Sequence, residues 1–342
     1  CQSQRIAYNS CRNRHCPKCQ SLARAQWIEQ RQAELLNVEY FHVVFTVPQE
    51  IAAIALQNKA ALYNLLFAAT SQTLQTIAAD PKHLGAQIGF FAILHTWGQN
   101  LTHHPHLHCV IPGGGRSSDG ERWVGCRPGF FLPVRVLSRY FRRCYLEGLQ
   151  RLFDRGELRF GGSLAPLQER AAFLSSLKPL REKEWVVYAK APFAGPKQVL
   201  DYVGRYTHRV ALSNNRLLNI EEGEVTFRWK DYREGDAQKT MTLDTHEFMR
   251  RFLLHVLPLG LKRIRYYGLL GPRHRQANLT RCRELLRMPA PASPIPPPKD
   301  HRDRYAALTG RSLHLCRDCQ RGRMLTVRCI APVRTPPAMD TS

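Results

Sequence analysis

The sequence predicts an α+β protein in which helices cover the faces of a mixed sheet, with a small cysteine-containing module before it and a short cysteine-containing tail after it. Runs rich in β-branched and aromatic residues, such as Phe41–Val47, alternate with longer stretches of helical spacing, such as Pro133–Phe153. The first twenty residues are dense in Cys, Arg and Lys and poor in large aliphatic residues. Such a segment cannot build an apolar core, so it needs a metal to fold.

The predicted elements follow from residue type and spacing. Phe41–Val47 is expected to be a strand because it is β-branched and aromatic and ends at Pro48, and the alanine- and leucine-rich stretch to Ala79 is expected to be helical. Pro196 opens a helix, since proline at the first helical position has no useful donor to lose. The other expected elements are strands at Ile88–Trp97, His106–Ile111 and Trp185–Ala189, a helix at Pro133–Phe153, a hairpin of Val225–Trp229 with Thr240–Leu243, and a helix from Thr245.

Composition divides the chain into four parts. We expect a zinc-binding module at 1–30, truncated at its amino end because the sequence opens on Cys1, and a main domain at 38–287. The proline-rich stretch 288–299 predicts a stiff linker. Residues 300–342 form the tail.

Charge points to nucleic acid as the partner. The 50 Lys and Arg residues outnumber the 27 Asp and Glu residues, for a formal net charge of +23. A compact body with this charge repels itself unless a polyanion neutralises it, and a basic ribosomal or membrane-surface protein is the alternative.

The expected location is the cytoplasm, in association with the nucleoid. The apolar stretch Ile51–Thr70 is interrupted by Gln57, Asn58 and Lys59, so it predicts a core helix and no membrane partner. The eleven cysteines are odd in number and tightly spaced. Both features favour reduced, metal-binding thiols over disulfides.

Cysteine spacing predicts structural zinc. Cys16 and Cys19 are separated by two residues, which lets both thiolates bind one tetrahedral Zn²⁺, and Cys1 lies upstream at a distance suited to a zinc ribbon. The fourth ligand is Cys11, a lost partner of Cys1, or His15. In the tail, Cys316, Cys319 and Cys329 are candidate ligands of a second zinc ion.

The stretch Thr102–His108 predicts a second kind of metal site. Side chains alternate along a strand, so His106 and His108 lie on one face while Leu107 points into the core. His104 joins that face if the strand extends back through Pro105. Two imidazoles on a rigid sheet can bind a divalent cation, with Gln99 or His95 as third ligand, although a histidine pair is also common as a structural feature.

Tyr202 and Tyr206 are candidate nucleophiles. They lie four residues apart on the helix opened by Pro196, so both hydroxyls project from one helical face. The alternative is an aromatic pair packed into the core. The charged neighbours Arg205, His208 and Arg209 argue against that alternative.

Basic residues predict contacts with DNA phosphates, although a solvated basic surface is the competing interpretation. The candidates are Arg12, Arg14 and Lys18 in the zinc module, Arg205 and Arg209 beside the tyrosines, and Lys262, Arg263, Arg265, Arg273 and Arg275, a track interleaved with Tyr266 and Tyr267.

Across nearly its whole length the sequence resembles the two-tyrosine HUH transposases of the insertion-sequence-ninety-one type. The matching stretches are SCRNRHCPKC at Ser10–Cys19, FHVVFTVP at Phe41–Pro48, HTWGQNL at His95–Leu101, HPHLH at His104–His108, YVGRYTH at Tyr202–His208 and IRYYG at Ile264–Gly268. The resemblance implies a ferredoxin-like antiparallel palm whose central strand carries His106 and His108. It also implies that Tyr202 and Tyr206 face a bound Mg²⁺ or Mn²⁺.

The same resemblance implies rolling-circle transposition. In this chemistry single-stranded or hairpin DNA at element ends and target is cleaved and rejoined through 5′-phosphotyrosine intermediates. Two alternatives are a plasmid replication initiator or relaxase with the same chemistry, and a non-catalytic zinc-dependent DNA-binding protein. Only the catalytic proteins form a covalent DNA adduct.

Overall fold

The structure is a computed structural model that describes residues 1, 3–6, 20–190, 198, 200, 204, 211–231, 234, 235, 237–289, 298 and 300–330. The chain divides into two compact units. Unit 1 joins residues 1–10 to residues 293–342, and unit 2 comprises residues 11–292. The boundaries expected from composition, at residues 30, 288 and 300, remain predictions.

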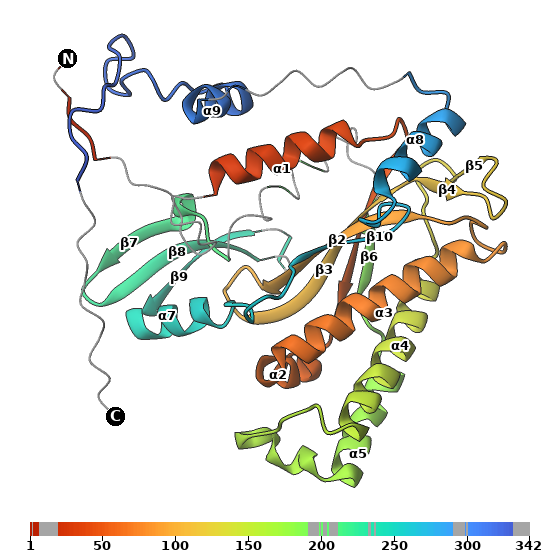
Figure 1. The fold of residues 1–342 in the computed structure, drawn as a ribbon. Helices are drawn as coiled ribbons and strands as arrows, with labels where there is room; N and C mark the ends of the chain where they lie inside the picture. Colours follow the sequence, from red (N-terminus) through yellow and green to blue (C-terminus); the bar gives the residue numbers. More distant parts are fainter. Residues whose placement is uncertain are drawn as a thin grey trace. The chain divides into compact units, whose positions relative to one another are not determined.

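A five-stranded antiparallel sheet forms the centre of unit 2 and confirms the predicted α+β class (Figure 1). Its strand order is β10-β2-β3-β1-β6, so β3 is the central strand. The strands are β1 Tyr40–Thr46, β2 Gly89–Trp97, β3 His103–Pro112, β6 Val187–Lys190 and β10 Ile264–Gly268. The predicted strands at 41–47, 88–97 and 106–111 are therefore confirmed to within a few residues.

Helices cover one face of this sheet. Alternate residues of β1, β2 and β3, among them Phe45, Leu94 and Leu107, are buried in one large apolar cluster with residues of α3 and α4. Figure 1 shows α3 and α4 crossing each other next to the sheet, and the two helices are in contact. The helices that contribute to this cluster are α2 Gln49–Gln57, α3 Lys59–Ala79, α4 Val134–Asp154 and α5 Arg170–Glu182.

The opposite face carries a smaller apolar cluster and α1, Ser21–Ala33. Trp27 of α1 packs edge-on against Phe91 of β2, with ring centroids 5.6 Å apart. Leu200, which is helical and 1% exposed, joins Phe91, Ile93 and Val110 in this cluster. Leu200 therefore packs on the face opposite α3 and α4.

A second, three-stranded sheet confirms the predicted hairpin and extends it by one strand. Its order is β7-β8-β9, with bounds Leu217–Glu221, Glu224–Asp231 and Ala237–Asp244. Helix α7, Thr245–Leu253, begins where predicted because the Asp244 carboxylate accepts hydrogen bonds from the backbone N–H groups of His246 and Glu247.

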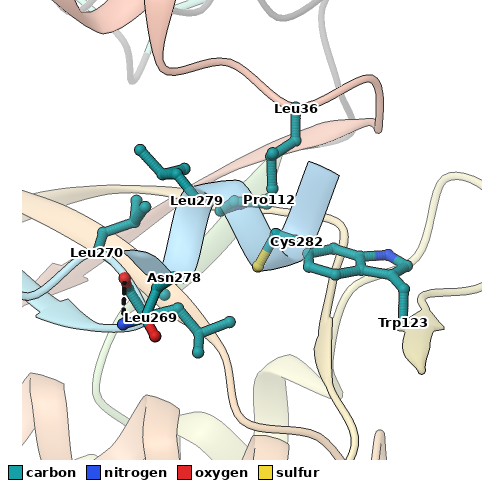
Figure 2. Close-up of a pocket in the computed structure, with 9 residues that line it drawn as sticks. Leu36, Pro112, Trp123, Leu269, Leu270, Asn278, Leu279 and Cys282 are labelled. Carbon is teal, nitrogen blue, oxygen red and sulfur yellow. Dashed lines mark hydrogen bonds between the residues drawn. The ribbon is translucent and has the colours of Figure 1, made fainter. Parts of the chain in front are cut away.

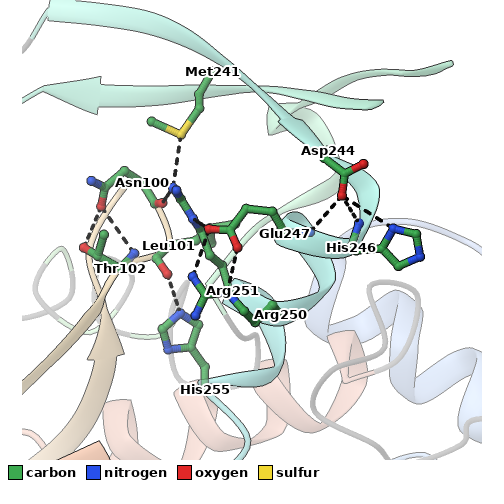
Figure 3. Close-up of polar contacts among 10 residues, drawn as sticks. All are labelled: Asn100, Leu101, Thr102, Met241, Asp244, His246, Glu247, Arg250, Arg251 and His255. Atoms are coloured by element: carbon green, nitrogen blue, oxygen red, sulfur yellow. Dashed lines mark hydrogen bonds and ion pairs between the residues drawn. The ribbon is translucent and has the colours of Figure 1, made fainter. Parts of the chain in front are cut away.

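The loop between β2 and β3 is tied to α7 (Figure 3). Arg251 of α7 donates to the carbonyl of Asn100 at 3.4 Å and pairs with Glu247 at 2.6 Å. His255 Nε2 donates to the carbonyl of Leu101 at 3.2 Å. These contacts fix the end of the hairpin that carries the histidines.

Helix α8, Arg275–Leu285, packs at the other end of β2 and β10. Asn278 donates to the carbonyl of Leu269 at 3.0 Å, and Leu279 and Cys282 line a small apolar pocket that Trp123 closes (Figure 2). Trp123 comes from the hairpin of β4, Gly114–Arg116, and β5, Trp123–Gly125, whose turn contains Asp119 and Gly120.

Two sequence predictions differ in detail from the structure. The helix expected up to Ala79 is divided at Asn58, whose amide caps the break by donating to the carbonyl of Ile54. Strand β3 extends back through Pro105 to His103, because Pro105 pairs with neither neighbouring strand and loses no ladder hydrogen bond. Among the described helices, none combines the length and the apolar character required to cross a membrane.

Unit 1 contains α9, His301–Thr309, followed by a tight turn. Cys316 N–H donates to the carbonyl of Gly322 at 2.7 Å, and Met324 N–H donates to the carbonyl of His314 at 2.7 Å. The turn therefore closes as a short hairpin around Cys316 and Cys319.

We predict that Gly268→Ala destabilises unit 2 more than Gly223→Ala does. Both glycines have positive φ, +55° and +78°, where an alanine is strained by roughly 1–2 kcal/mol. At Gly268 the added Cβ would also clash with the carbonyl oxygen of Ile88, whereas at Gly223 it meets open space. Denaturant unfolding should give a loss of about 1 kcal/mol for Gly223→Ala and a clearly larger loss for Gly268→Ala. Equal losses would contradict the close backbone approach.

Candidate metal centre

Histidines gather on the face of the central sheet that lies opposite α3 and α4. In the strand register His95 of β2 is directly opposite His106 of β3, and His108 is opposite Ile93. Leu107, between the two β3 histidines, is fully buried in the cluster on the other face. The predicted alternation is therefore confirmed, and the register adds His95 to the pair.

Three imidazoles converge at this point. Ring centroids of His95 and His108 lie 4.1 Å apart, those of His106 and His108 4.9 Å, and those of His95 and His106 5.4 Å. One nitrogen from each ring lies within 4.8 Å of the others. Three neutral imidazoles at this spacing can bind one divalent cation.

Hydrogen bonds orient the two β3 rings. His106 Nδ1–H donates to the backbone carbonyl of His104 at 2.7 Å, which leaves the lone pair on Nε2. His108 Nδ1 shares a 2.7 Å hydrogen bond with Nε2 of His42, and the two rings are stacked. Within the described part of the chain, the buried Nε2 atom of His108 has no hydrogen-bond partner. Histidine ligands of metals are commonly held by such bonds from their second ring nitrogen.

Burial keeps the histidines of this face neutral. Desolvation, and to a smaller extent the neighbouring Lys190, lowers the pKa of His42 to about 4. Desolvation, followed by the charge of His104, lowers the pKa of His106 to about 3. The pKa values of His95 and His108 are also well below the usual range, because of burial first and neighbouring cationic groups second. A neutral imidazole is the form that binds metal.

His42 is a site residue that the sequence analysis missed. It lies in β1 on the same face as the β3 histidines and is 5% exposed. The available signal was a histidine inside the apolar run Phe41–Val47, at a position whose side chain faces away from Phe41 and Val43. The sequence of this run does not indicate which strand it pairs with, and so it does not show that His42 and His108 share a face of the sheet.

Of the two expected third ligands, His95 is in the cluster and Gln99 is in the turn after β2. The Gln99 backbone carbonyl accepts a hydrogen bond from Arg216. His95 stacks on Trp97, with centroids 4.8 Å apart. The geometry thus favours His95, whose role as a ligand remains a prediction.

The segment in which the sequence predicts the tyrosine helix is described at only a few positions. Gln198, Leu200 and Gly204 are helical, and Leu200 packs on the face that carries the histidines. A Cβ at Gly204 would collide with the side chain of Ile28 in α1, so the two segments are in close contact there. Tyr202, Tyr206, Arg205, His208 and Arg209 lie outside the described residues.

The basic track is not uniform in exposure. Lys262 and Arg273 are exposed, and Arg275 is half-buried with its guanidinium over the Tyr266 ring. Arg263 is 5% exposed and donates to the carbonyl of Leu94 at 2.9 Å, which does not suit a surface contact with phosphate. Arg265 packs over the Phe67 ring on α3.

Of the candidate zinc ligands, the structure describes only those in unit 1. Sulfur atoms of Cys1, Cys316 and Cys319 form a second group within 4.8 Å of one another, and Cys329 is exposed. Cys11, Cys16 and Cys19, together with Arg12, Arg14, His15 and Lys18, lie outside the described residues. The ligand set expected in the amino-terminal module therefore stays a prediction.

Comparison with known proteins places this sequence in a family. Residues 89–278, more than half of the chain, match the family model Y2_Tnp, described as "Putative transposase", and residues 1–47 match the transposase zinc-binding domain model Zn_Tnp_IS91. The "Putative transposase y4qJ" of Sinorhizobium fredii is 66% identical over 344 residues, covering 100% of this chain and 86% of the relative.

Two further similarities are more distant. The transposase for insertion sequence element IS801 of Pseudomonas savastanoi pv. phaseolicola is 28% identical over 302 residues, covering 87% of this chain and 70% of the relative. A solved conjugative relaxase, TrwC in complex with oriT DNA, is 17% identical with a TM-score of 0.28 over 49% of this chain and 64% of that chain, a likeness too low to carry an argument. From the family models and the first relative, the chain belongs to the two-tyrosine transposases of the insertion-sequence-ninety-one type.

Proposed function

We propose that this transposase cleaves and rejoins single-stranded DNA with Tyr202 and Tyr206 as nucleophiles, beside a divalent metal held by His95, His106 and His108. The convergence of the three neutral imidazoles on one face of the central strands carries this proposal. The packing of Leu200 on the same face supports it, because Leu200 precedes Tyr202 by two residues in the sequence.

The residues present fit a bound metal ion. His106 keeps an Nε2 lone pair because its Nδ1–H is bonded to the His104 carbonyl. If His108 binds through its buried Nε2, its Nδ1–H donates to His42 Nε2, so His42 is neutral with its own proton on Nδ1. Three imidazoles favour Mn²⁺ over Mg²⁺. When bound, the ion neutralises charge on the phosphate oxygens.

The two tyrosines then carry out cleavage and strand transfer. The phenolic oxygen of one tyrosine attacks phosphorus in line, the bond to the 3′ oxygen breaks, and the phenolic proton ends on the released 3′-hydroxyl. The phosphate remains on the tyrosine at the 5′ end of the downstream strand. A 3′-hydroxyl from another strand reverses the step, so no external energy source is needed, and the second tyrosine can cut a second end while the first is occupied.

The covalent adduct is the decisive test. We expect 3′-labelled single-stranded oligonucleotides, tiled across the DNA on both sides of the gene, to label the full chain covalently in the presence of Mn²⁺. The same DNA labelled at its 5′ end should release a shorter labelled fragment and leave the protein unlabelled. Denaturing gels distinguish the two products.

The matched variants locate the nucleophiles. Tyr202→Phe combined with Tyr206→Phe should abolish the adduct, whereas Tyr188→Phe, at an exposed tyrosine on the edge strand β6, should leave it unchanged. A folded wild-type protein that forms no adduct with any oligonucleotide would favour the non-catalytic DNA-binding alternative. An adduct that survives the double substitution would rule out these tyrosines.

The third metal ligand is tested by comparing two variants. His95→Ala should weaken Mn²⁺ binding by at least about tenfold, as loss of a ligand or of its support does, while Gln99→Ala should leave it unchanged. His104→Ala is the control, because it removes a neighbouring imidazole and keeps the backbone carbonyl that holds His106. Calorimetric titration measures the Kd for Mn²⁺ of all three variants. Weaker binding in Gln99→Ala with unchanged binding in His95→Ala would make Gln99 the ligand.

Metal binding should also resist acid. Protons compete with the metal only near the folded pKa of each ligand, and this pKa is about 3 for His106. We expect the Kd for Mn²⁺ to rise by less than about tenfold from pH 7 to pH 5. Exposed imidazoles with a pKa of about 6.5 would instead lose affinity by orders of magnitude over this range, and such a loss would contradict the burial of the site.

A further inference from the structure

Unit 1 contains a thiol cluster built from opposite ends of the chain. Cys1 Sγ lies 3.8 Å from Cys316 Sγ, across 315 residues of sequence, and Cys319 completes the group. Ser3 donates a hydrogen bond to Asp318, and Arg5 lies 3.9 Å from the same carboxylate. The two chain ends therefore meet at several adjacent positions.

The sulfur separation allows a shared metal ion. Two thiolates on one tetrahedral zinc, each with a Zn–S bond of about 2.3 Å, are about 3.8 Å apart. A disulfide requires about 2.05 Å. The distance between Cys1 and Cys316 is compatible with the first arrangement, as it is with a contact between two free thiols, and it is too long for a disulfide.

The turn that holds Cys316 and Cys319 is organised around sulfur. Gly322 N–H donates to Cys319 Sγ at 3.4 Å, and Gln320, at φ +55°, lets the chain reverse with its N–H bonded to the Cys316 carbonyl at 2.9 Å. The backbone of this turn therefore holds the two sulfur atoms close together.

No apolar core accounts for the meeting of the two ends. Among the described residues of unit 1 (1, 3–6, 298 and 300–330), Cys316 is the single buried side chain. The four apolar clusters formed by the described residues all lie in unit 2. Exposed contacts such as the one between Arg5 and Asp318 contribute about 0–1 kcal/mol, which is too little to hold two ends together. A small unit of this kind needs a metal.

We propose that Cys1, Cys316 and Cys319 together bind one structural zinc ion that joins the amino-terminal segment to the carboxyl-terminal turn. Binding replaces the three thiol protons, which pass to solvent, and a donor outside these three fills the fourth position. The zinc-binding domain match ends at residue 47 and includes no tail residue, so the tail thiols are an addition to it.

The experiment counts zinc ions on the full chain. The chain is purified under reducing conditions with zinc, and bound metal is measured by mass spectrometry for Cys1→Ser, Cys316→Ser, Cys319→Ser and the double variant Cys1→Ser with Cys316→Ser. We expect each single variant to lose one equivalent. We expect the double variant to lose one equivalent and no more, because both thiols serve the same ion.

The opposite results are equally clear. If Cys1 belongs to a separate amino-terminal zinc site, the double variant loses two equivalents; if Cys1 binds no zinc, Cys1→Ser loses none. Either result overturns the proposal. Cys329→Ser is the matched control, since this exposed thiol is outside the group and its loss should release no zinc.

Cobalt gives a second readout that does not depend on counting. Co²⁺ in place of zinc should produce thiolate-to-metal charge-transfer absorption that falls by a similar step in each of the three single variants and is unchanged in Cys329→Ser. Because the apolar clusters of the described residues lie in unit 2, most of the far-ultraviolet circular dichroism signal should persist in all variants. If the charge-transfer absorption falls in Cys316→Ser and Cys319→Ser but not in Cys1→Ser, that result would also contradict a zinc ion shared by the three thiols.

Discussion

The pairing of β3 with β2 on one side and β1 on the other is the constraint on which the site depends. Antiparallel pairing places His95 directly opposite His106, and the pleat sends Leu107 to the other face. A slip of one residue would exchange the two faces of β3, burying His106 and His108 against α3. The apolar alternation of the strand therefore fixes the position of the imidazoles.

The surroundings of the imidazoles determine their chemical state. Desolvation lowers their pKa values, and the buried guanidinium of Arg263 adds a cationic neighbour that lowers those of His95 and His108 further. The same burial would be costly for charged ligands, but it is tolerated by neutral imidazoles whose second nitrogens are hydrogen-bonded. His42 and the His104 carbonyl supply those bonds, so an outer ring of partners holds the cluster in the form that binds metal.

The two units are stabilised by different interactions. Unit 2 buries a large apolar cluster on one face of its sheet and a smaller one on the other, which is sufficient for a domain of its size. Unit 1 buries one thiol among its described residues, and a zinc ion shared by Cys1, Cys316 and Cys319 takes the place of an apolar core.

Local patterns in the sequence determined much of this protein. Residue type and spacing predicted β1, β2, β3 and the start of α7, and the spacing of His106 and His108 placed both on one face. These features depend on neighbours within a few residues, which a single sequence displays. Family membership was also apparent from motifs, because short stretches in a fixed order are specific.

Only the tertiary structure decided which distant residues meet. His95 joined the cluster through strand register, His42 through the pairing of β1 with β3, and Cys1 through a contact with a turn more than three hundred residues away. The burial of Arg263 likewise depends on Trp97 of the neighbouring strand. Such contacts depend on how strands pair and how elements pack. A local residue pattern specifies a helix or a strand, but it does not specify which other elements will lie next to it.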